Sequence, residues 1–313
     1  MSEALVALPS FTQLSKQVWR VLGLNPGKFT LQGTNTYLLG AGAKKLLIDS
    51  GQGIPEYIPL LHESLQKISP EAYISDIIIT HGHPDHFGGL KDILGSSLLN
   101  KQQKKITVHK FPAPILHRYS EDQSSFPKDV PFEPLYDGKI FRADSVTLRT
   151  VHTPGHTKDH CTFWFEEENS LFTADCVLGQ GTAVFEDLHE YLVGLQKLLK
   201  LKPGKLYPGH GPVIEEGVAK IKEYISHREL REKQLVDLLT SKKDKKQWTS
   251  MEVTSVLYKD YPESLHLPAA RGIMLILQKL EKEGKAKMAK GSTEGQNITD
   301  LVNNQWQWVD SNL

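Results

Sequence analysis

Seven side chains that could bind metal ions fall into four short clusters of the sequence. The first cluster is the motif HGHPDH at residues 81–86, which places His81, His83, Asp85 and His86 within six positions. Imidazole nitrogens and carboxylate oxygens are common zinc ligands in proteins. The glycine and the proline of the motif favour a loop, in which His81 and His83 would face one metal ion and Asp85 and His86 a second one.

The remaining three side chains are His156 in TPGHT, Asp175 in TADC and His210 in PGHGP. Each is a weak signal alone, because a single histidine is more often a structural residue than a ligand. Together with the first cluster they would complete two tetrahedral sites, with one carboxylate able to bridge and an open position on each metal for water. We therefore expect two Zn²⁺ ions per chain, bound by His81, His83, Asp85, His86, His156, Asp175 and His210.

Such a centre would make the chain a metal-dependent hydrolase. Two zinc ions ~3.5–4 Å apart would share Asp175 and a hydroxide, whose parent water would have a pKa of ~7. The same ions would polarise a phosphoryl or carbonyl oxygen, so that no serine or cysteine nucleophile is needed. Asp85 and Asp175 are thus the expected catalytic residues, and Asp85 could orient the hydroxide. Asp49 is a candidate hydrogen-bond partner of a metal-binding histidine, although a structural role fits it equally well.

Segments typical of β-strands precede each of these clusters. Runs rich in apolar and β-branched residues cover 36–39, 45–49, 76–80, 146–151, 161–165, 170–173 and 205–207. Apolar residues at helical spacing predict helices over 57–68 and 188–200. Because each cluster begins where a strand ends, we expect the site on loops at the carboxyl ends of sheet strands, held by an α/β scaffold.

The sequence changes character near residue 217. We expect a catalytic domain over 1–217, a charged connecting helix and linker over 218–247, and a small domain over 248–313. Helical patterns at 250–258 and 269–283, followed by a terminal segment with Trp306 and Trp308 suited to a hairpin, are in the order of a winged-helix module. The lysine-rich run 242–246 is interpreted as a solvated linker rather than a nucleic-acid contact.

Composition limits the other classes of function. Lys plus Arg and Asp plus Glu balance at 37 each, so the chain lacks the basic excess typical of proteins that bind nucleic acid through phosphates. No apolar run approaches the ~20 residues of a membrane span, and the amino-terminal segment has no secretory pattern. We expect an intracellular protein that is not secreted, has no membrane partner and keeps Cys161 and Cys176 as buried thiols.

These motifs together resemble the metallo-β-lactamase superfamily of αββα hydrolases, whose hallmark is HxHxDH followed by a later His, Asp and His. Similarity to its β-lactamase-like protein 2 branch covers FTLQGTNTYLLG (29–40), HTPGHT (152–157), GTAVFEDL (181–188), YPGHGPVI (207–214) and ISHRELRE (225–232). That resemblance implies an α/β fold, an αββα sandwich with a small winged-helix-like C-terminal domain. It also implies an endoribonuclease acting on single-stranded RNA in mitochondria, so we expect the mitochondrial matrix or the cytoplasm.

Two residues depart from the pattern of the relatives. Gly82 stands where Trp is usual, and Ala174 stands where Gly commonly precedes the aspartate. Neither departure removes a ligand. Gly82 would leave space at the rim of the metal site, so it bears on substrate preference rather than on hydrolysis.

Three hypotheses stay open at this point. The first is an endoribonuclease that cleaves single-stranded RNA with a metal-bound hydroxide; Arg271, Lys279 and Lys282 could contact phosphates or could equally form a solvated helix face. The second is a thioesterase that releases acyl or polyketide chains from a carrier protein, since GQGIPEY (51–57) is similar to fungal enzymes of that kind. The third, a non-catalytic nucleic-acid-binding protein, is disfavoured because a structural zinc site needs only four ligands.

Overall fold

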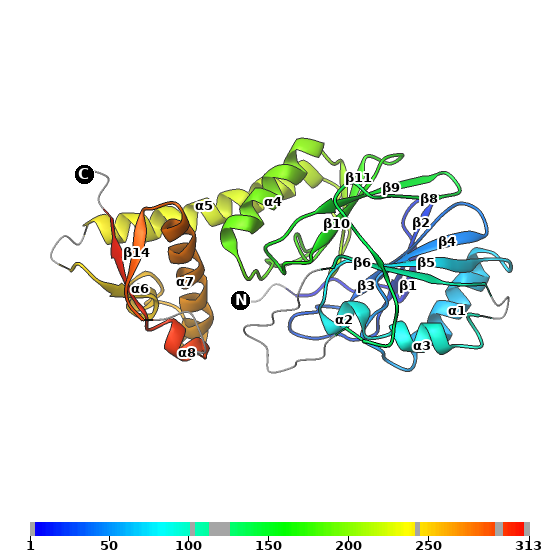
Figure 1. Cartoon of the computed structure of the whole chain (residues 1–313), viewed down its shortest axis with the longest axis horizontal. Coiled ribbons are helices and arrows are strands. Elements are labelled where there is room, and N and C mark those ends of the chain that lie inside the picture. Colours follow the sequence, from blue (N-terminus) through cyan, green and yellow to red (C-terminus); the bar gives the residue numbers. More distant parts are fainter. Residues whose placement is uncertain (1–3, 101–103, 113–125, 242–244, 292–296, 310–313) are drawn as a thin grey trace. The chain divides into compact units, whose positions relative to one another are not determined.

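The computed structural model describes residues 4–100, 104–112, 126–241, 245–291 and 297–309 (Figure 1). The chain forms two compact units. Among the described residues, the first unit holds those up to 185 together with 190–222, and the second holds 186–189 and those from 223 onward. This division falls inside one long helix, so the domain boundaries expected at 217 and 247 stay predictions.

A seven-stranded sheet forms the first layer of the first unit, with its strands in sequence order. The strands are β1 (Phe11–Gln13), β2 (Val18–Leu22), β3 (Asn35–Leu39), β4 (Lys44–Ile48), β5 (Tyr73–Ile79), β6 (Thr107–Lys110) and β7 (Glu133–Pro134). Neighbours are antiparallel from β1 to β4 and parallel from β4 to β7. The apolar runs predict β3, β4 and β5, whereas β1, β2, β6 and β7 are not expected from the sequence.

A five-stranded sheet forms the second layer, in the order β12-β11-β10-β9-β8. Its strands are β8 (Ile140–Ala143), β9 (Val146–His152), β10 (Cys161–Phe165), β11 (Ser170–Ala174) and β12 (Lys205–Pro208). The β11 and β12 strands are parallel, while the other neighbours are antiparallel. The strands β9, β11 and β12 therefore run in one direction, and their carboxyl ends lie at the same edge.

The central strands β2, β3, β10 and β11 are buried at every residue. Successive residues of a strand point to opposite faces of the sheet. In β3, Tyr37 and Leu39 pack between the two sheets, whereas Leu38 packs on the opposite face of the first sheet. Both faces are buried, so a polar residue at any of these positions would carry a desolvation cost.

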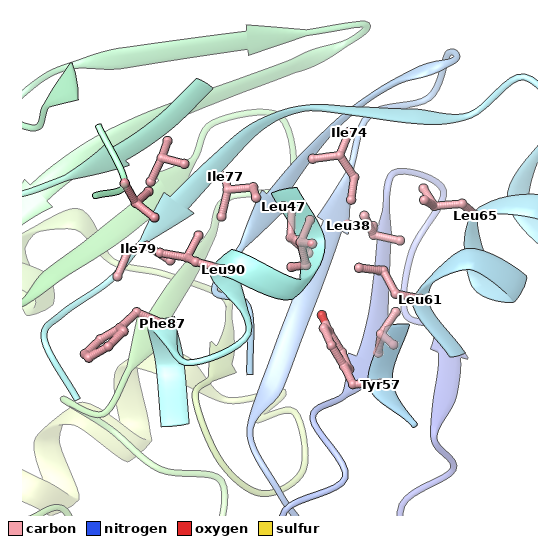
Figure 2. Packing of buried hydrophobic residues seen from close by; sticks show 14 of the residues in the cluster. Leu38, Leu47, Tyr57, Leu61, Leu65, Ile74, Ile77, Ile79, Phe87 and Leu90 are labelled. Atoms are coloured by element: carbon pink, nitrogen blue, oxygen red, sulfur yellow. The ribbon is translucent and has the colours of Figure 1, made fainter. Parts of the chain in front are cut away.

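Three helices cover the outer face of the first sheet: α1 (Tyr57–Ile68), α2 (Pro84–Phe87) and α3 (Leu90–Gly95). Figure 2 shows side chains of this layer, including Leu38, Leu47 and Ile77 from the sheet and Tyr57, Leu61, Phe87 and Leu90 from the helices. A further helix, α4 (Leu188–Leu201), is tied to the end of the second sheet, because the Tyr191 hydroxyl donates to the Cys176 carbonyl oxygen at 2.6 Å.

The second unit has the element order of a winged helix. It contains α6 (Ser250–Leu257), a 3₁₀ turn (Glu263–Leu265), α7 (His266–Lys282), β14 (Ala286–Lys290), α8 (Ile298–Leu301) and β15 (Gln305–Trp308). The Thr249 side chain and Glu252 form a capping box that starts α6. Strand β13 (Trp248–Thr249) extends the expected hairpin to a three-stranded sheet in the order β13-β15-β14.

The long helix α5 (Gly217–Ser241) contributes residues to both units. Residues 242–244 of the expected lysine-rich linker lie outside the described part of the chain. Within the described ranges, no helix is both long enough and apolar enough to span a membrane.

Candidate metal centre

The ends of four strands bring the expected ligands together. His81 follows β5, while His156, Asp175 and His210 follow β9, β11 and β12. The latter three strands share one direction, so their loops meet at one edge of the second sheet. The backbone N–H of Cys161 donates to the Thr80 carbonyl oxygen at 2.9 Å, which joins the two sheets beside this edge.

The HGHPDH motif is not a loop throughout, which corrects the expectation from its glycine and proline. Residues Pro84–Phe87 form the short helix α2, with His83 as its N-cap residue. Proline is favoured in the first turn of a helix, where its missing N–H loses no hydrogen bond. Pro84 therefore starts a helix, which carries Asp85 and His86, whereas His81 and His83 lie before it.

His81, His83 and His156 converge on one point, and we call them the first half-site. The Nε2 atom of His81 lies 2.9 Å from Nδ1 of His83. The Nε2 atom of His156 lies 3.2 Å from the first of these atoms and 3.0 Å from the second. Three nitrogens bound to one tetrahedral zinc ion at ~2.0–2.1 Å lie about 3.3 Å apart, so the observed spacing is close to that of a metal site.

Asp85, His86 and His210 form the second half-site. Asp85 Oδ2 lies 3.2 Å from His86 Nε2 and 3.3 Å from His210 Nε2. Asp175 adjoins both half-sites: its Oδ1 lies 3.4 Å from His86 Nε2, and its Oδ2 lies 3.4 Å from His210 Nε2 and 3.6 Å from His156 Nε2. A carboxylate in this position can bridge two metal ions.

Two buried atoms of this cluster test whether its residues fit a metal ion. His86 Nε2 and Asp175 Oδ1 have no hydrogen-bond partner among the described residues, although they lie only 3.4 Å apart. Buried polar atoms are almost always paired, so two such atoms side by side need an explanation. A cation between them would satisfy both, and the residues therefore fit a metal ion.

Hydrogen bonds on the far side of the rings select which nitrogen can bind a metal. In four of the five histidines Nδ1 contacts an oxygen, which leaves Nε2 for the metal; His83 instead presents Nδ1 to the first half-site. Partners of this kind orient metal-binding histidines. The contacts are the Thr80 hydroxyl at 2.9 Å for His81, the Asp49 carboxylate at 2.7 Å for His86, the Val184 carbonyl at 2.7 Å for His156 and the Gly33 carbonyl at 3.4 Å for His210.

Asp49 contacts the ring of His86, so it has the first of the two roles that the sequence suggested, that of a hydrogen-bond partner of a metal-binding histidine. Besides the contact with His86, it accepts hydrogen bonds from the Thr80 backbone N–H at 2.8 Å and from the Thr80 hydroxyl at 3.0 Å. Because the same hydroxyl also contacts His81, one buried network links a ligand of each half-site.

The charges of the site differ between its two halves. Burial disfavours a proton on His210, but the Asp175 and Asp85 carboxylates outweigh burial and raise the pKa of His210 to about 9. In the first half-site, burial and the neighbouring His156 lower the pKa of His83 to about 3. The pKa values of His81 and His156 are lowered as well, so at neutral pH the three histidines of the first half-site are uncharged, whereas His210 of the second must release a proton when a metal binds.

Some residues beside the site were not found from the sequence. The Thr34 hydroxyl donates to Asp85 Oδ2 at 3.2 Å and accepts from the Asn25 amide at 3.0 Å. His160 is buried with its ring centroid 5.2 Å from that of His81, and burial lowers the pKa of His160 to about 3. Thr34 lies in the stretch GTNT (33–36) and His160 in TKDH (157–160). Nothing in the spacing of these residues along the sequence indicates that they lie beside the ligands.

The two departures from the superfamily pattern have structural consequences. Gly82, expected to open space at the rim, is itself buried, and its backbone N–H donates to Asp159. Ala174 has a φ of 43°, in the left-handed region that glycine adopts more readily. Opposite it, a Cβ on Gly209 would lie 2.4 Å from Asp175 Oδ1, so the bridging carboxylate needs glycine there.

The two cysteines pack in the core, as their expected role requires. Both are buried, and neither belongs to a group of possible metal ligands in the described ranges. Burial, reinforced by Asp175, raises the pKa of Cys176 to about 12, so this thiol stays protonated and is a poor metal ligand.

Comparison with known proteins identifies the family and the fold. The family model "Metallo-beta-lactamase superfamily" matches residues 29–210, a range that contains all seven candidate ligands. The chain belongs to the metallo-β-lactamase superfamily. The model "Beta-lactamase associated winged helix domain" matches residues 249–295, in agreement with the element order of the second unit.

Relatives in this superfamily cover nearly the whole chain. A "Beta-lactamase-like protein 2 homolog" of Drosophila melanogaster is 42% identical over 92% of this chain and 95% of its own length. A homologue of the same name from Caenorhabditis elegans is 44% identical over 88% and 90%. An "Atrochrysone carboxyl ACP thioesterase" of Aspergillus novofumigatus is 40% identical over 75% of this chain and 66% of its own.

A solved structure supports the same fold. A β-lactamase domain protein from Burkholderia ambifaria aligns over 97% of this chain and 95% of its own, with a TM-score of 0.73 and 16% identity. The metallo-β-lactamase fold with its winged helix is thus confirmed, together with a metal-dependent hydrolase site of His and Asp residues that fits two metals.

Proposed function

We propose that this chain is a zinc-dependent endoribonuclease that hydrolyses single-stranded RNA. The observation that carries the proposal is the match along nearly the whole chain, winged helix included, to the β-lactamase-like protein 2 homologues. The resemblance to that branch is what implies RNA as the substrate. Nitrogen-rich ligands with two carboxylates suit zinc better than magnesium or calcium, which prefer oxygen ligands.

The residues of the site have distinct roles in such a hydrolysis. When bound, a pair of metal ions supplies a water of lowered pKa and polarises the oxygen under attack. Despite burial, His86 and His210 hold the pKa of Asp85 well below its usual range, so this carboxylate is ionised. It can therefore accept a hydrogen bond from a water molecule and orient that molecule. The Thr34 hydroxyl donates a hydrogen bond to the same carboxylate and so restricts its orientation.

Two of the three basic residues considered as RNA contacts on helix α7, Lys279 and Lys282, have acidic partners. The Lys279 ammonium lies 2.7 Å from Glu232 and 2.6 Å from Glu283, with only 11% of its side chain exposed, so it serves the second unit rather than a phosphate. Lys282 contacts Asp187. Strand β14 adds two further exposed lysines, Lys287 and Lys290.

A thioesterase is the alternative function, favoured by the 40% identity with the fungal carrier-protein thioesterase. That relative matches only 75% of this chain, whereas the β-lactamase-like protein 2 homologue of Drosophila matches 92%. The same metal centre could attack a thioester carbonyl, so the ligands alone do not distinguish the two reactions.

A parallel turnover assay tests the proposal. The zinc-loaded protein is offered unstructured RNA, duplex RNA, an acyl thioester and a β-lactam at low salt. We expect cleavage of the unstructured RNA, and Lys287→Gln with Lys290→Gln should flatten its salt dependence by ~0.7 in log–log slope for each phosphate that is no longer bound. Efficient thioester turnover without RNA cleavage, with two zinc ions bound, would replace the endoribonuclease by the thioesterase.

A further inference from the structure

A buried ion pair lies directly behind the first half-site. The Lys110 ammonium, at the end of β6, donates to Asp159 Oδ2 at 2.6 Å, and the two side chains are only 3% and 6% exposed. Removing two charges from water costs several kcal/mol per ion, and an apolar pair of similar volume would often stabilise the fold as well or better. Packing alone therefore does not explain these residue types here.

The remaining hydrogen bonds of Asp159 reach both loops of the first half-site. Its Oδ1 accepts from the Thr157 hydroxyl at 2.7 Å, and its carboxylate also accepts from the Gly82 backbone N–H. Thr157 is the residue after His156, and Gly82 stands between His81 and His83. One carboxylate thus touches the two segments that supply all three nitrogens.

These two segments have different origins in the fold. The His81 segment extends β5 of the seven-stranded sheet, whereas the His156 segment follows β9 of the five-stranded sheet (Figure 1). The two sheets share no strand in the described ranges. The apolar core between them and the Cys161–Thr80 hydrogen bond fix the sheets to each other, and contacts between the two loops adjust the spacing of the three nitrogens, which lie within 3.2 Å of one another. Lys110 comes from β6, the direct neighbour of β5, and so anchors the carboxylate to the first sheet.

Asp159 is ionised in this environment. Burial opposes its charge, but the Lys110 ammonium and the hydrogen bonds from Thr157 and Gly82 outweigh burial and lower the pKa of Asp159. An ionised carboxylate accepts stronger hydrogen bonds than a neutral one.

We propose that Asp159, held by Lys110, is a positioning residue that sets the spacing between the His81–His83 pair and His156 and so tunes the affinity of the first half-site for its metal. The inference rests on the metal centre of the proposed function. Asp159 contacts Lys110, Thr157 and Gly82, whereas the second half-site takes its ligands from α2 and from the loop after β12. A change at Asp159 should therefore alter the metal affinity of the first half-site and not that of the second.

Equilibrium metal titration of the full chain tests the proposal. Apo protein is titrated with Co²⁺, followed by its absorption spectrum, and with Zn²⁺ against a chelator. We expect Asp159→Asn to weaken one of two metal equivalents by about 10–100-fold, the range found for partners of metal ligands, and to alter its Co²⁺ spectrum. The other equivalent should keep its affinity, and excess metal should restore turnover.

Further variants separate this role from a general loss of stability. Thr157→Val removes one hydroxyl and leaves Asp159 paired with Lys110, so it should weaken the same equivalent to a smaller extent. Thr157→Ser keeps the hydroxyl and should bind metal as the wild type does. Asp129→Asn is the matched control, because Asp129 pairs with Lys91 at 2.8 Å on the surface, with 69% of its side chain exposed. This control should bind both metals as the wild type does.

Two outcomes would contradict the inference in different ways. If Asp159→Asn and Thr157→Val both bound two metal equivalents with wild-type affinities and spectra, the positioning role would be wrong while the proposed function stood. A wild-type chain that bound fewer than two equivalents would overturn the dinuclear centre, and with it this inference.

Discussion

At the scale of the residue, Asp175 is the side chain on which both half-sites depend. Its two carboxylate oxygens lie 3.4–3.6 Å from nitrogens of His86, His210 and His156. Despite burial, His210 and His86 hold its pKa well below the usual range, so the carboxylate is ionised at neutral pH. No other carboxylate among the described residues adjoins both groups of ligands.

We expect Asp175→Ala to lower turnover by at least about a hundredfold and to reduce bound metal below two equivalents, because two cations would face each other without a bridging anion. Metal analysis after dialysis and a turnover assay measure the two effects. Cys176→Ser, a neighbouring buried change outside the ligand groups, serves as control and should keep both metals. Wild-type turnover of the alanine variant with two metals bound would refute the bridging role.

The second half-site should bind metal more tightly as the pH rises. The folded-state pKa of His210 is about 9, so at neutral pH a metal must displace its proton. The apparent affinity should therefore rise by about tenfold for each unit of pH per proton released, until it levels off near pH 9. Metal titrations at several pH values test this, and an affinity that is flat between about pH 6.5 and 9 would contradict it.

The metal-free protein should show the opposite trend in stability. Because the pKa of His210 is raised on folding, its contribution to stability is complete below the unfolded value of about 6.5 and disappears as pH rises through about 9. Denaturant unfolding with a chelator present should therefore show a loss of stability from this group across that window. Asp137→Asn, an exposed carboxylate on the surface, should leave the pH profile unchanged.

At the scale of the element, the ends of β11 and β12 must approach closely to place Asp175 and His210. The Gly209 backbone N–H donates to the Ala174 carbonyl oxygen at 2.8 Å. A methyl group on Gly209 would lie 2.4 Å from Asp175 Oδ1 and 3.0 Å from the Ala174 carbonyl carbon. These approaches leave no room for a side chain between the two strand ends.

Substitution of Ala174 by glycine should leave the stability of the fold nearly unchanged, although Ala174 is buried. The left-handed conformation costs a non-glycine residue about 1–2 kcal/mol, while the added freedom of glycine in the unfolded chain costs about 0.4–1 kcal/mol. Loss of the buried Ala174 methyl group costs about 0.8 kcal/mol more, so the terms nearly cancel and the denaturant midpoint should change little. Ala143→Gly, in strand β8 with ordinary φ, should instead destabilise; equal effects of the two substitutions would contradict the argument.

At the scale of the whole molecule, the metal centre belongs to the first unit alone. All seven candidate ligands lie in that unit, while α7 and the three-stranded sheet belong to the second. A metal that binds only the native first unit stabilises it by mass action, about 2.7 kcal/mol at a hundredfold excess over its Kd.

Chelation should therefore act on one unit. We expect amide hydrogen exchange to accelerate in β5, α2 and the loops after β11 and β12, and to stay unchanged in α7, because opening of the second unit does not release a metal. Mass spectrometry of peptides from the two units measures the difference. A similar acceleration in α7 would show that the two units unfold as one.

Sequence alone was sufficient to select the seven side chains that the structure brings together. HGHPDH holds four of them through local spacing, and the other three follow apolar strands whose carboxyl ends meet at one sheet edge. The strands β3, β4, β5, β9, β10, β11 and β12 are predicted within a few residues for the same reason, since their period and composition are local properties.

Only the tertiary structure decided which side chains support those ligands. Thr34, Asp159 and Lys110 stand far from their partners in the sequence, and a hydrogen bond across strands leaves no trace in local spacing. Pro84 is compatible with a loop and with the first turn of a helix, and the helix that it begins packs through Phe87 into the core. The charge of Lys279 suggested an RNA contact, but its burial between Glu232 and Glu283 became visible only in the folded unit.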